Sequence, residues 1–126
     1  MYRRTIAIAS ALSVLALGSP LITANANPLA RQYFDQAVDK YDAGNYQGAI
    51  ADYTKSLEIN PRNSNSYYNR GLAKYSLEDY QGAIADFTKS LEINPQDANS
   101  YYSRGLAKYD LEDYQGSISD YTKSLR

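Results

Sequence analysis

Residues 67–92 read YYNRGLAKYSLEDYQGAIADFTKSLE, and residues 101–126 read YYSRGLAKYDLEDYQGSISDYTKSLR. The two stretches align without a gap at a spacing of 34 residues and differ at six of 26 positions. A more diverged third copy, YFDQAVDKYDAGNYQGAIADYTKSLE, occupies residues 33–58. A period of about 20 to 50 residues is typical of repeat architectures. The sequence therefore predicts three copies of one structural unit.

Each copy is predicted to form two helices joined by a turn. In the second copy, the first helix is expected over residues 65–76, and the second begins after Asp79, whose carboxylate can accept from amide groups of the first turn. Asn94-Pro95 ends the second helix, because proline keeps the preceding residue out of helical geometry. The equivalent capping and proline positions in the other copies are Asn45, Asp113, Asn60 and Pro61.

Three glycines oppose this assignment, because each lies inside a second helix and costs about 1 kcal/mol relative to alanine. They are Gly48, Gly82 and Gly116. We expect packing to override their low helix propensity.

The aromatic residues repeat with the same period. The chain holds 14 tyrosines and 2 phenylalanines, and all but Tyr2 fall at five equivalent places. These are Tyr33/Tyr67/Tyr101, Phe34/Tyr68/Tyr102, Tyr41/Tyr75/Tyr109, Tyr46/Tyr80/Tyr114 and Tyr53/Phe87/Tyr121. Rings at fixed helical spacing are expected to fill the space between neighbouring hairpins, with hydroxyl groups reaching water or backbone.

The pattern resembles the tetratricopeptide repeat family, whose 34-residue unit has an aromatic residue, a glycine, a central alanine, a second aromatic residue and a closing proline. In the second copy these are Tyr67, Gly71, Ala83, Phe87 and Pro95. The resemblance implies an all-α solenoid of three helix hairpins in a short right-handed superhelix. In the family's usual frame the repeats span residues 30–63, 64–97 and 98–126, and the third is truncated.

Two sets of charged residues are interpreted as surface features. Arg70 and Arg104 stand where the family often has leucine, and we expect their stems to cover apolar neighbours while the charged heads reach solvent. Acidic and basic residues three apart are expected to pair on exposed helix faces. These pairs are Asp52/Lys55, Asp86/Lys89 and Asp120/Lys123.

The first 26 residues have the layout of a signal peptide. Arg3 and Arg4 precede an apolar run over residues 6–17, and Ala24 and Ala26 fit the small-residue requirement of a signal peptidase. The run is shorter than the roughly 20 residues that span a bilayer. We therefore expect cleavage after Ala26 and export to a periplasm, a lumen or the exterior, with no stable membrane span remaining.

Composition excludes much chemistry. The chain has no cysteine and no histidine, which removes thiolate nucleophiles, disulfides, Cys/His zinc sites and histidine bases. The leader's only charges are two arginines, so residues 27–126 hold 11 basic and 14 acidic groups. A net negative chain does not suit a polyanion. We expect no nucleic-acid partner, no cofactor, no metal and no enzymatic activity.

By resemblance, the binding surface is the concave wall formed by the first helix of every hairpin, where another protein or peptide would lie. The candidate residues are Phe34, Val38, Tyr41, Asn65, Tyr68, Asn69, Leu72, Tyr75, Asn99, Tyr102, Ser103, Leu106 and Tyr109. The wall is aromatic, amidic and nearly uncharged. Such a surface suits an apolar or aromatic peptide whose backbone is held by amides. The open alternative is that tyrosines such as Tyr68 and Tyr102 pack onto neighbouring hairpins and meet no ligand.

Some family members hold a partner's terminal carboxylate with lysine, asparagine and arginine at fixed places of the groove. The matching residues here are Phe34, Val38, Asn69, Asn99 and Ser103. Only Asn69 agrees with that pattern, so the sequence does not predict a carboxylate clamp.

The third copy stops at Arg126, at about the end of its second helix, and is nearly a duplicate of the middle copy. Repeat arrays usually have a polar outer face on their terminal units. Leu111, Ile118, Tyr121 and Leu125 are therefore expected to expose part of a stacking face. Two explanations remain open: the chain is a shortened form of a longer array, or copies assemble through this face. Self-stacking is thus the alternative function.

Overall fold

The computed structural model describes residues 27–126, and every regular element in this part of the chain is an α-helix. The helices are α3 (Pro28–Asp42), α4 (Tyr46–Ile59), α5 (Ser64–Ser76), α6 (Tyr80–Ile93), α7 (Ala98–Asp110) and α8 (Tyr114–Ser124). The predicted leader and its cleavage site at Ala24 and Ala26 lie outside the described residues.

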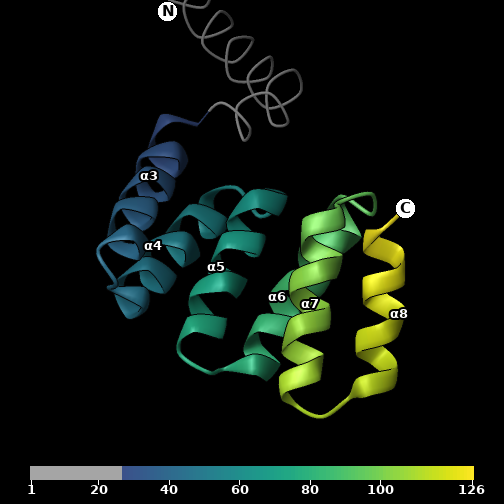
Figure 1. The fold of residues 1–126 in the computed structure, drawn as a ribbon. Helices are drawn as coiled ribbons and strands as arrows, with labels where there is room; N and C mark the ends of the chain where they lie inside the picture. Colours follow the sequence, from purple (N-terminus) through teal and green to yellow (C-terminus); the bar gives the residue numbers. More distant parts are fainter. Residues whose placement is uncertain (1–26) are drawn as a thin grey trace, which may run out of the picture.

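Consecutive helices pair as three antiparallel hairpins, α3/α4, α5/α6 and α7/α8, which stack side by side in chain order (Figure 1). The second helix of one hairpin packs against the first helix of the next, α4 on α5 and α6 on α7. This arrangement confirms the predicted all-α solenoid of three hairpins.

A capping side chain explains why the second helices contain glycine. Asp79 caps α6, and its carboxylate oxygen accepts from the Gly82 amide at 2.9 Å. A Cβ atom on Gly82 would lie 2.1 Å from the other oxygen of that carboxylate. Asn45 over Gly48 and Asp113 over Gly116 repeat this arrangement. The glycines therefore make room for the cap, rather than being tolerated because of tertiary packing.

The turn inside each hairpin needs a left-handed residue. Gly44 supplies it in the first hairpin with φ of 79°. Glu78 and Glu112 occupy the equivalent positions with φ of 64° and 63°. Since the left-handed region disfavours residues with a Cβ atom, these two turns are strained where the first is not.

Two small-residue cores sit between the hairpins. Ala37, Ala49 and Tyr53 of the first hairpin enclose Ala73 of α5, and Ala83 and Phe87 enclose Ala107 of α7 in the same way. Tyr53 and Phe87 are fully buried, as expected for aromatic residues between hairpins. The other aromatic places are only partly buried or exposed.

The expectation that Arg70 and Arg104 extend their charged heads into solvent was wrong. Arg70 donates through Nε and Nη2 to both carboxylate oxygens of Asp86, at 2.8 and 2.7 Å, and Arg104 holds Asp120 in the same way at 2.8 and 2.8 Å. Two N–H groups of a guanidinium match the two oxygens of a carboxylate. Each pair therefore joins the two helices of one hairpin. The bond to the carboxylate raises the pKa of each arginine.

The predicted exposed pairs of Asp52, Asp86 and Asp120 with the lysine three residues later were also wrong, because all three carboxylates are buried. Each is paired instead with a lysine of the preceding helix: Lys40 at 2.6 Å, Lys74 at 3.0 Å and Lys108 at 2.9 Å, respectively. Burial alone would raise the pKa of Asp120, but the hydrogen bonds from Arg104 and Lys108 outweigh burial and lower it.

Candidate functional site: the first-helix wall and an adjoining pocket

All thirteen candidate groove residues lie on α3, α5 and α7, the first helices of the three hairpins. Four of them are exposed: Asn65, Asn99, Tyr102 and Tyr109. Eight are partly buried: Phe34, Val38, Tyr41, Tyr68, Asn69, Leu72, Tyr75 and Leu106. Ser103 is buried, with 7% of its surface exposed.

In each hairpin, two rings of the wall each pack on a ring of the second helix. One set is Tyr41, Tyr75 and Tyr109, whose centres lie 5.1, 5.3 and 5.3 Å from those of Tyr46, Tyr80 and Tyr114, respectively. The other set is Phe34, Tyr68 and Tyr102. The rings of Phe34 and Tyr53 have their centres 5.6 Å apart, and those of Tyr68 and Phe87 are 5.7 Å apart. In the third hairpin, Tyr102 and Tyr121 are 5.5 Å apart. Such a contact favours the observed ring orientation by about 0.5–1.5 kcal/mol. The front ring of each pair is therefore packed on a partner before any ligand arrives.

Two tyrosine hydroxyl groups of the wall contact the next hairpin. The Tyr68 hydroxyl lies 3.5 Å from Ser103 Oγ, and the Tyr75 hydroxyl donates to Asp110, both across the α5–α7 contact. The bond to Asp110, followed by burial, raises the pKa of Tyr75 to about 12. Tyr68 and Tyr75 thus pack partly on the next hairpin, as the alternative interpretation expected. Their equivalents Tyr102 and Tyr109 are 52% and 55% exposed.

Two candidate polar groups are already engaged inside the protein. The Asn69 side-chain amide donates to the Asn65 carbonyl at 2.8 Å. Ser103 is buried at the α5–α7 contact. Of the five residues tested against the carboxylate-clamp pattern, Asn99 is therefore the polar one that is both exposed and outside these contacts.

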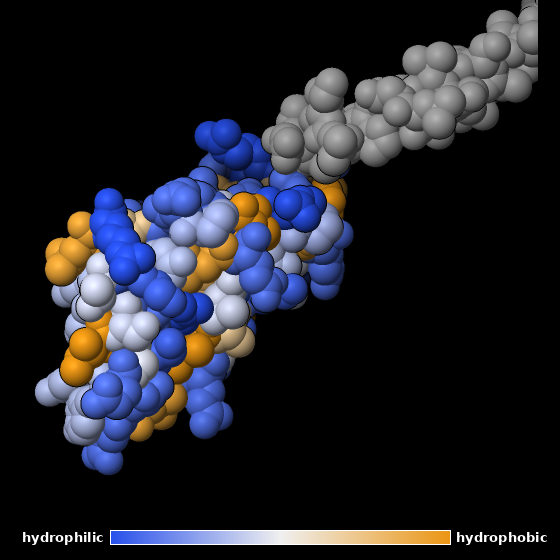
Figure 2. All heavy atoms as spheres, turned by 90° about the vertical axis from the view of Figure 1, so that its right-hand side faces the viewer, coloured by the Kyte–Doolittle hydropathy of each residue, from blue (hydrophilic) through white to orange (hydrophobic). Residues whose placement is uncertain are grey.

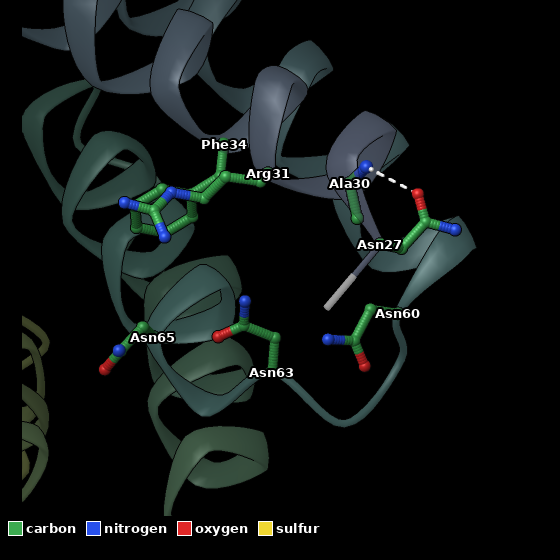
Figure 3. A pocket seen from close by; sticks show the side chains of 7 residues that line it. All are labelled: Asn27, Ala30, Arg31, Phe34, Asn60, Asn63 and Asn65. Atoms are coloured by element: carbon green, nitrogen blue, oxygen red, sulfur yellow. Dashed lines mark hydrogen bonds between the residues drawn. The ribbon is translucent and has the colours of Figure 1, made fainter. Parts of the chain in front are cut away.

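A pocket adjoins the wall where α3 begins and the α4–α5 turn passes it (Figure 3). Its volume is about 280 Å³. The lining residues are Asn27, Ala30, Arg31, Phe34, Asn60, Asn63 and Asn65. Phe34 and Asn65 were candidates from the sequence, and the structure brings them together here. Sequence reasoning missed the other five.

The asparagine amides of this pocket are oriented by the backbone. The Asn63 side-chain oxygen accepts from the Ser66 amide at 3.3 Å, and that of Asn60 accepts from the Arg62 amide at 3.4 Å. Their NH₂ groups have no hydrogen-bond partner among residues 27–126, and both nitrogens point into the space below α3 in Figure 3. Arg31 and Phe34 also line the pocket, and Arg31 Nε donates to Asp35 at 3.3 Å. The pocket therefore offers donors beside an aromatic surface and fits hydrogen-bond acceptors such as carbonyl or carboxylate oxygens.

A sequence signal for part of this pocket existed. Asn60 stands before proline, and Asn63 stands where a helix begins, so both were recognisable as turn and cap residues. The sequence did not predict that the start of α3 lies against that turn. This contact depends on how two hairpins stack.

Metal sites and membrane-spanning helices were also considered for residues 27–126. These residues contain no group of three or more acidic side chains arranged to hold a metal ion. No helix among them combines the length and the apolar character needed to cross a membrane.

Family models agree with the repeat period. Models described as tetratricopeptide repeat match residues 64–97 and 98–126, and one described as TPR repeat matches residues 38–77. Together they span residues 38–126. A search of curated proteins finds no match.

Solved structures give the same result. The first TPR domain of Spaghetti (RPAP3), bound to the HSP90 peptide SRMEEVD, is 26% identical, with a TM-score of 0.75 over 77% of this chain and 77% of that one. The TPR domain of OM64 from Arabidopsis is 26% identical, with a TM-score of 0.75 over 76% of this chain and 79% of that chain. The Sgt2 TPR domain from Aspergillus fumigatus is 26% identical, with a TM-score of 0.74 over 77% and 64%. With its three stacked hairpins, its 34-residue period and these matches, the chain belongs to the tetratricopeptide repeat family.

Proposed function

We propose that this protein is an exported scaffold that binds another protein or a peptide along the wall formed by α3, α5 and α7. The observation that supports this most is the row of supported rings, Phe34, Tyr68 and Tyr102, one from each hairpin. Rings that already pack on a second ring lose less conformational entropy than freely rotating ones when a ligand covers them. The similarity to a TPR domain solved with a bound peptide supports the same proposal.

The pocket beside the wall would anchor one acceptor group of the ligand. Its NH₂ groups come from Asn60 and Asn63, and Arg31, which is paired with Asp35 through Nε, adds further N–H donors. Phe34 belongs to both the pocket and the row of rings, so a peptide lying over Phe34 reaches both. We therefore expect a ligand with apolar or aromatic side chains and an acceptor near the end that contacts α3.

Affinity capture with the purified protein as bait, from the fraction in which it resides, tests the proposal. Tyr102→Ser should reduce capture of a specific partner by about tenfold or more, because an interface tyrosine commonly contributes more than about 1 kcal/mol. Tyr101→Ser is the matched control, since the Tyr101 ring lies under Arg104 and Lys123, away from the wall. Equal capture by wild type and both variants would contradict binding at the wall.

Export is tested separately by the mass of the protein recovered from each cell fraction. A chain beginning at Asn27 outside the cytosol is expected. A cytosolic chain that retains Met1 to Ala26 would contradict export and would leave the binding proposal unaffected.

Assembly through the C-terminal face is a second candidate function. Leu125 is 87% exposed, whereas its equivalents Leu57 and Leu91 are each 6% exposed beneath the next hairpin. Ile118 on the same face is 58% exposed. Figure 2 looks toward this side of the molecule, where hydrophobic residues lie among hydrophilic ones. Light scattering over a range of concentrations tests self-association, and a monomer at every concentration would contradict it.

A further inference from the structure

The two internal interfaces show what kind of helix covers a face like the exposed one on α7 and α8. Places in the 34-residue repeat are counted from residues 30, 64 and 98. The exposed face repeats the surfaces that α3/α4 offers to α5 and that α5/α6 offers to α7. The residues that a covering helix needs can therefore be inferred from α5 and α7, which cover the equivalent surfaces.

Small residues at places three and ten let the covering helix approach. Ser66 and Ala73 of α5 are completely buried, and so are Ser100 and Ala107 of α7. Ala73 and Ala107 each lie in the core of the preceding hairpin. A larger side chain at place ten would not fit there, because these cores are already filled by Tyr53 and Phe87.

Arginine at place seven reaches back to the preceding hairpin. Arg70 Nη1 donates to Thr54 Oγ1 at 3.1 Å, and Arg104 Nη1 donates to Thr88 Oγ1 at 3.1 Å. Thr122 is the equivalent acceptor on the exposed face. Its hydroxyl donates to the Ile118 carbonyl at 2.8 Å, just as Thr54 donates to Ile50 at 2.7 Å. The Thr122 oxygen is thus left with lone pairs for an incoming arginine.

Place thirteen differs between the two interfaces, because it is Asp110 in α7 and Ser76 in α5. Tyr75 donates to Asp110, which is place thirteen of the following hairpin. Tyr109 is the equivalent donor on the exposed side and is 55% exposed.

The protein's own first helix does not match this pattern. Place ten of α3 is Asp39 and place three is Gln32, and both are exposed. Place seven is Gln36. If a second copy docked its first hairpin here, Asp39 would enter the position where Ala107 is buried, and a buried unpaired carboxylate is strongly unfavourable. A head-to-tail stack of copies is therefore disfavoured.

We infer that the C-terminal face binds a helix of another protein that has small residues at its first and eighth positions and arginine at the fifth. This spacing places all three on one side of a helix. The inference goes beyond the two candidate functions, because it assigns the C-terminal face to a foreign helix in place of a second copy, and it is independent of the α3–α5–α7 wall.

Peptides cut from the protein test the pattern. The α7 peptide, residues 97–110, is held helical by a lactam link between positions 98 and 102, on the opposite side from Ser100 and Ala107. Binding to the purified protein is measured by fluorescence anisotropy. The α7 peptide should bind, and its Ala107→Asp and Arg104→Gln versions, which copy Asp39 and Gln36, should each bind at least about tenfold more weakly. A linked α3 peptide of equal length is the natural negative control.

Variants of the protein locate the site. Leu125→Ser should weaken binding of the α7 peptide by about tenfold, and because Leu125 is 87% exposed the fold should persist. Leu29→Ser, at an exposed leucine of α3, should leave binding unchanged. The inference is overturned if the α7 and α3 peptides bind equally, if neither binds, or if Leu125→Ser has no effect. Concentration-dependent self-association of the protein without peptide would overturn the choice of a foreign helix while supporting assembly through this face.

Discussion

Arg70 joins the first helix of the middle hairpin to the second by donating hydrogen bonds to both carboxylate oxygens of Asp86, at 2.8 and 2.7 Å. Lys74, one turn further along α5, contacts the same carboxylate at 3.0 Å. The Asp86 side chain is only 4% exposed, and those of Arg70 and Lys74 are 17% and 21% exposed. A single carboxylate thus serves as counter-ion to two poorly hydrated cations, and its loss leaves both without this anionic partner.

Asp86→Asn should lower the free energy of unfolding by about 3 kcal/mol, in line with the loss of one partner from a buried pair. Asp52→Asn, at the equivalent position, should cost less than about 1 kcal/mol, because its partner Lys40 is 44% exposed. Urea denaturation of both variants measures the difference. Arg70→Gln, which copies Gln36, should fall between them because Lys74 remains. Equal losses for Asp86→Asn and Asp52→Asn would contradict this account.

Glu78→Gly should stabilise the protein by about 0.5–1 kcal/mol. The left-handed conformation of Glu78, with φ of 64°, is costly for a residue with a Cβ atom. Part of the gain is offset because glycine has more freedom in the unfolded chain. Gly44→Ala, at the equivalent turn, should destabilise by a similar amount. Thermal denaturation checks both variants, and a lower melting temperature for Glu78→Gly would refute the argument.

Tyr75 should make stability sensitive to alkaline pH. Its pKa is raised to about 12 by the hydrogen bond to Asp110 and by burial, from an ordinary value of 10.0. A raised pKa in the folded state means that the contribution of the protonated group is complete below about pH 10 and is lost as the pH rises toward 12. The destabilisation caused by Tyr75→Phe should therefore shrink between pH 9 and pH 12, as measured by denaturation at about 1-unit intervals. A constant difference would show that folding does not raise the pKa of Tyr75.

The repeat itself was predictable because its signal is a comparison of the chain with itself. The 34-residue period, the turn positions and the capping residues Asp79 and Asp113 were all readable, since each depends on local sequence. The resulting helix α6 begins at Tyr80 and ends at Ile93, as expected. The whole-fold prediction followed from these local features and the resemblance to known repeats.

Contacts between helices were where sequence reasoning failed. Asp86 and Lys89 are close along the chain, and this suggested a pair, but the buried carboxylate faces α5 and is met by Arg70 from 16 residues away. Similarly, Asn27 and Asn60 share a pocket only because the α4–α5 turn passes the start of α3. Spacing along one helix shows which residues share its face, whereas the partner of that face is set by how the hairpins stack.

The third repeat contains a buried serine where the others have alanine. Ser117 is 2% exposed, and its hydroxyl has no hydrogen-bond partner among residues 27–126. Ala49 and Ala83 at the same place are completely buried without a polar group. An unpaired buried hydroxyl is unfavourable, so Ser117→Ala should raise the free energy of unfolding by about 1–2 kcal/mol.

Ser119→Ala is the matched control, because Ser119 is exposed on the same helix and replaces an alanine of the other repeats. It should gain only the helix-propensity difference of about 0.5 kcal/mol. Urea denaturation of the two variants separates burial from propensity. If Ser119→Ala stabilised the protein as much as Ser117→Ala does, the gain would come from helix propensity alone, and the unpaired hydroxyl would have no measurable effect.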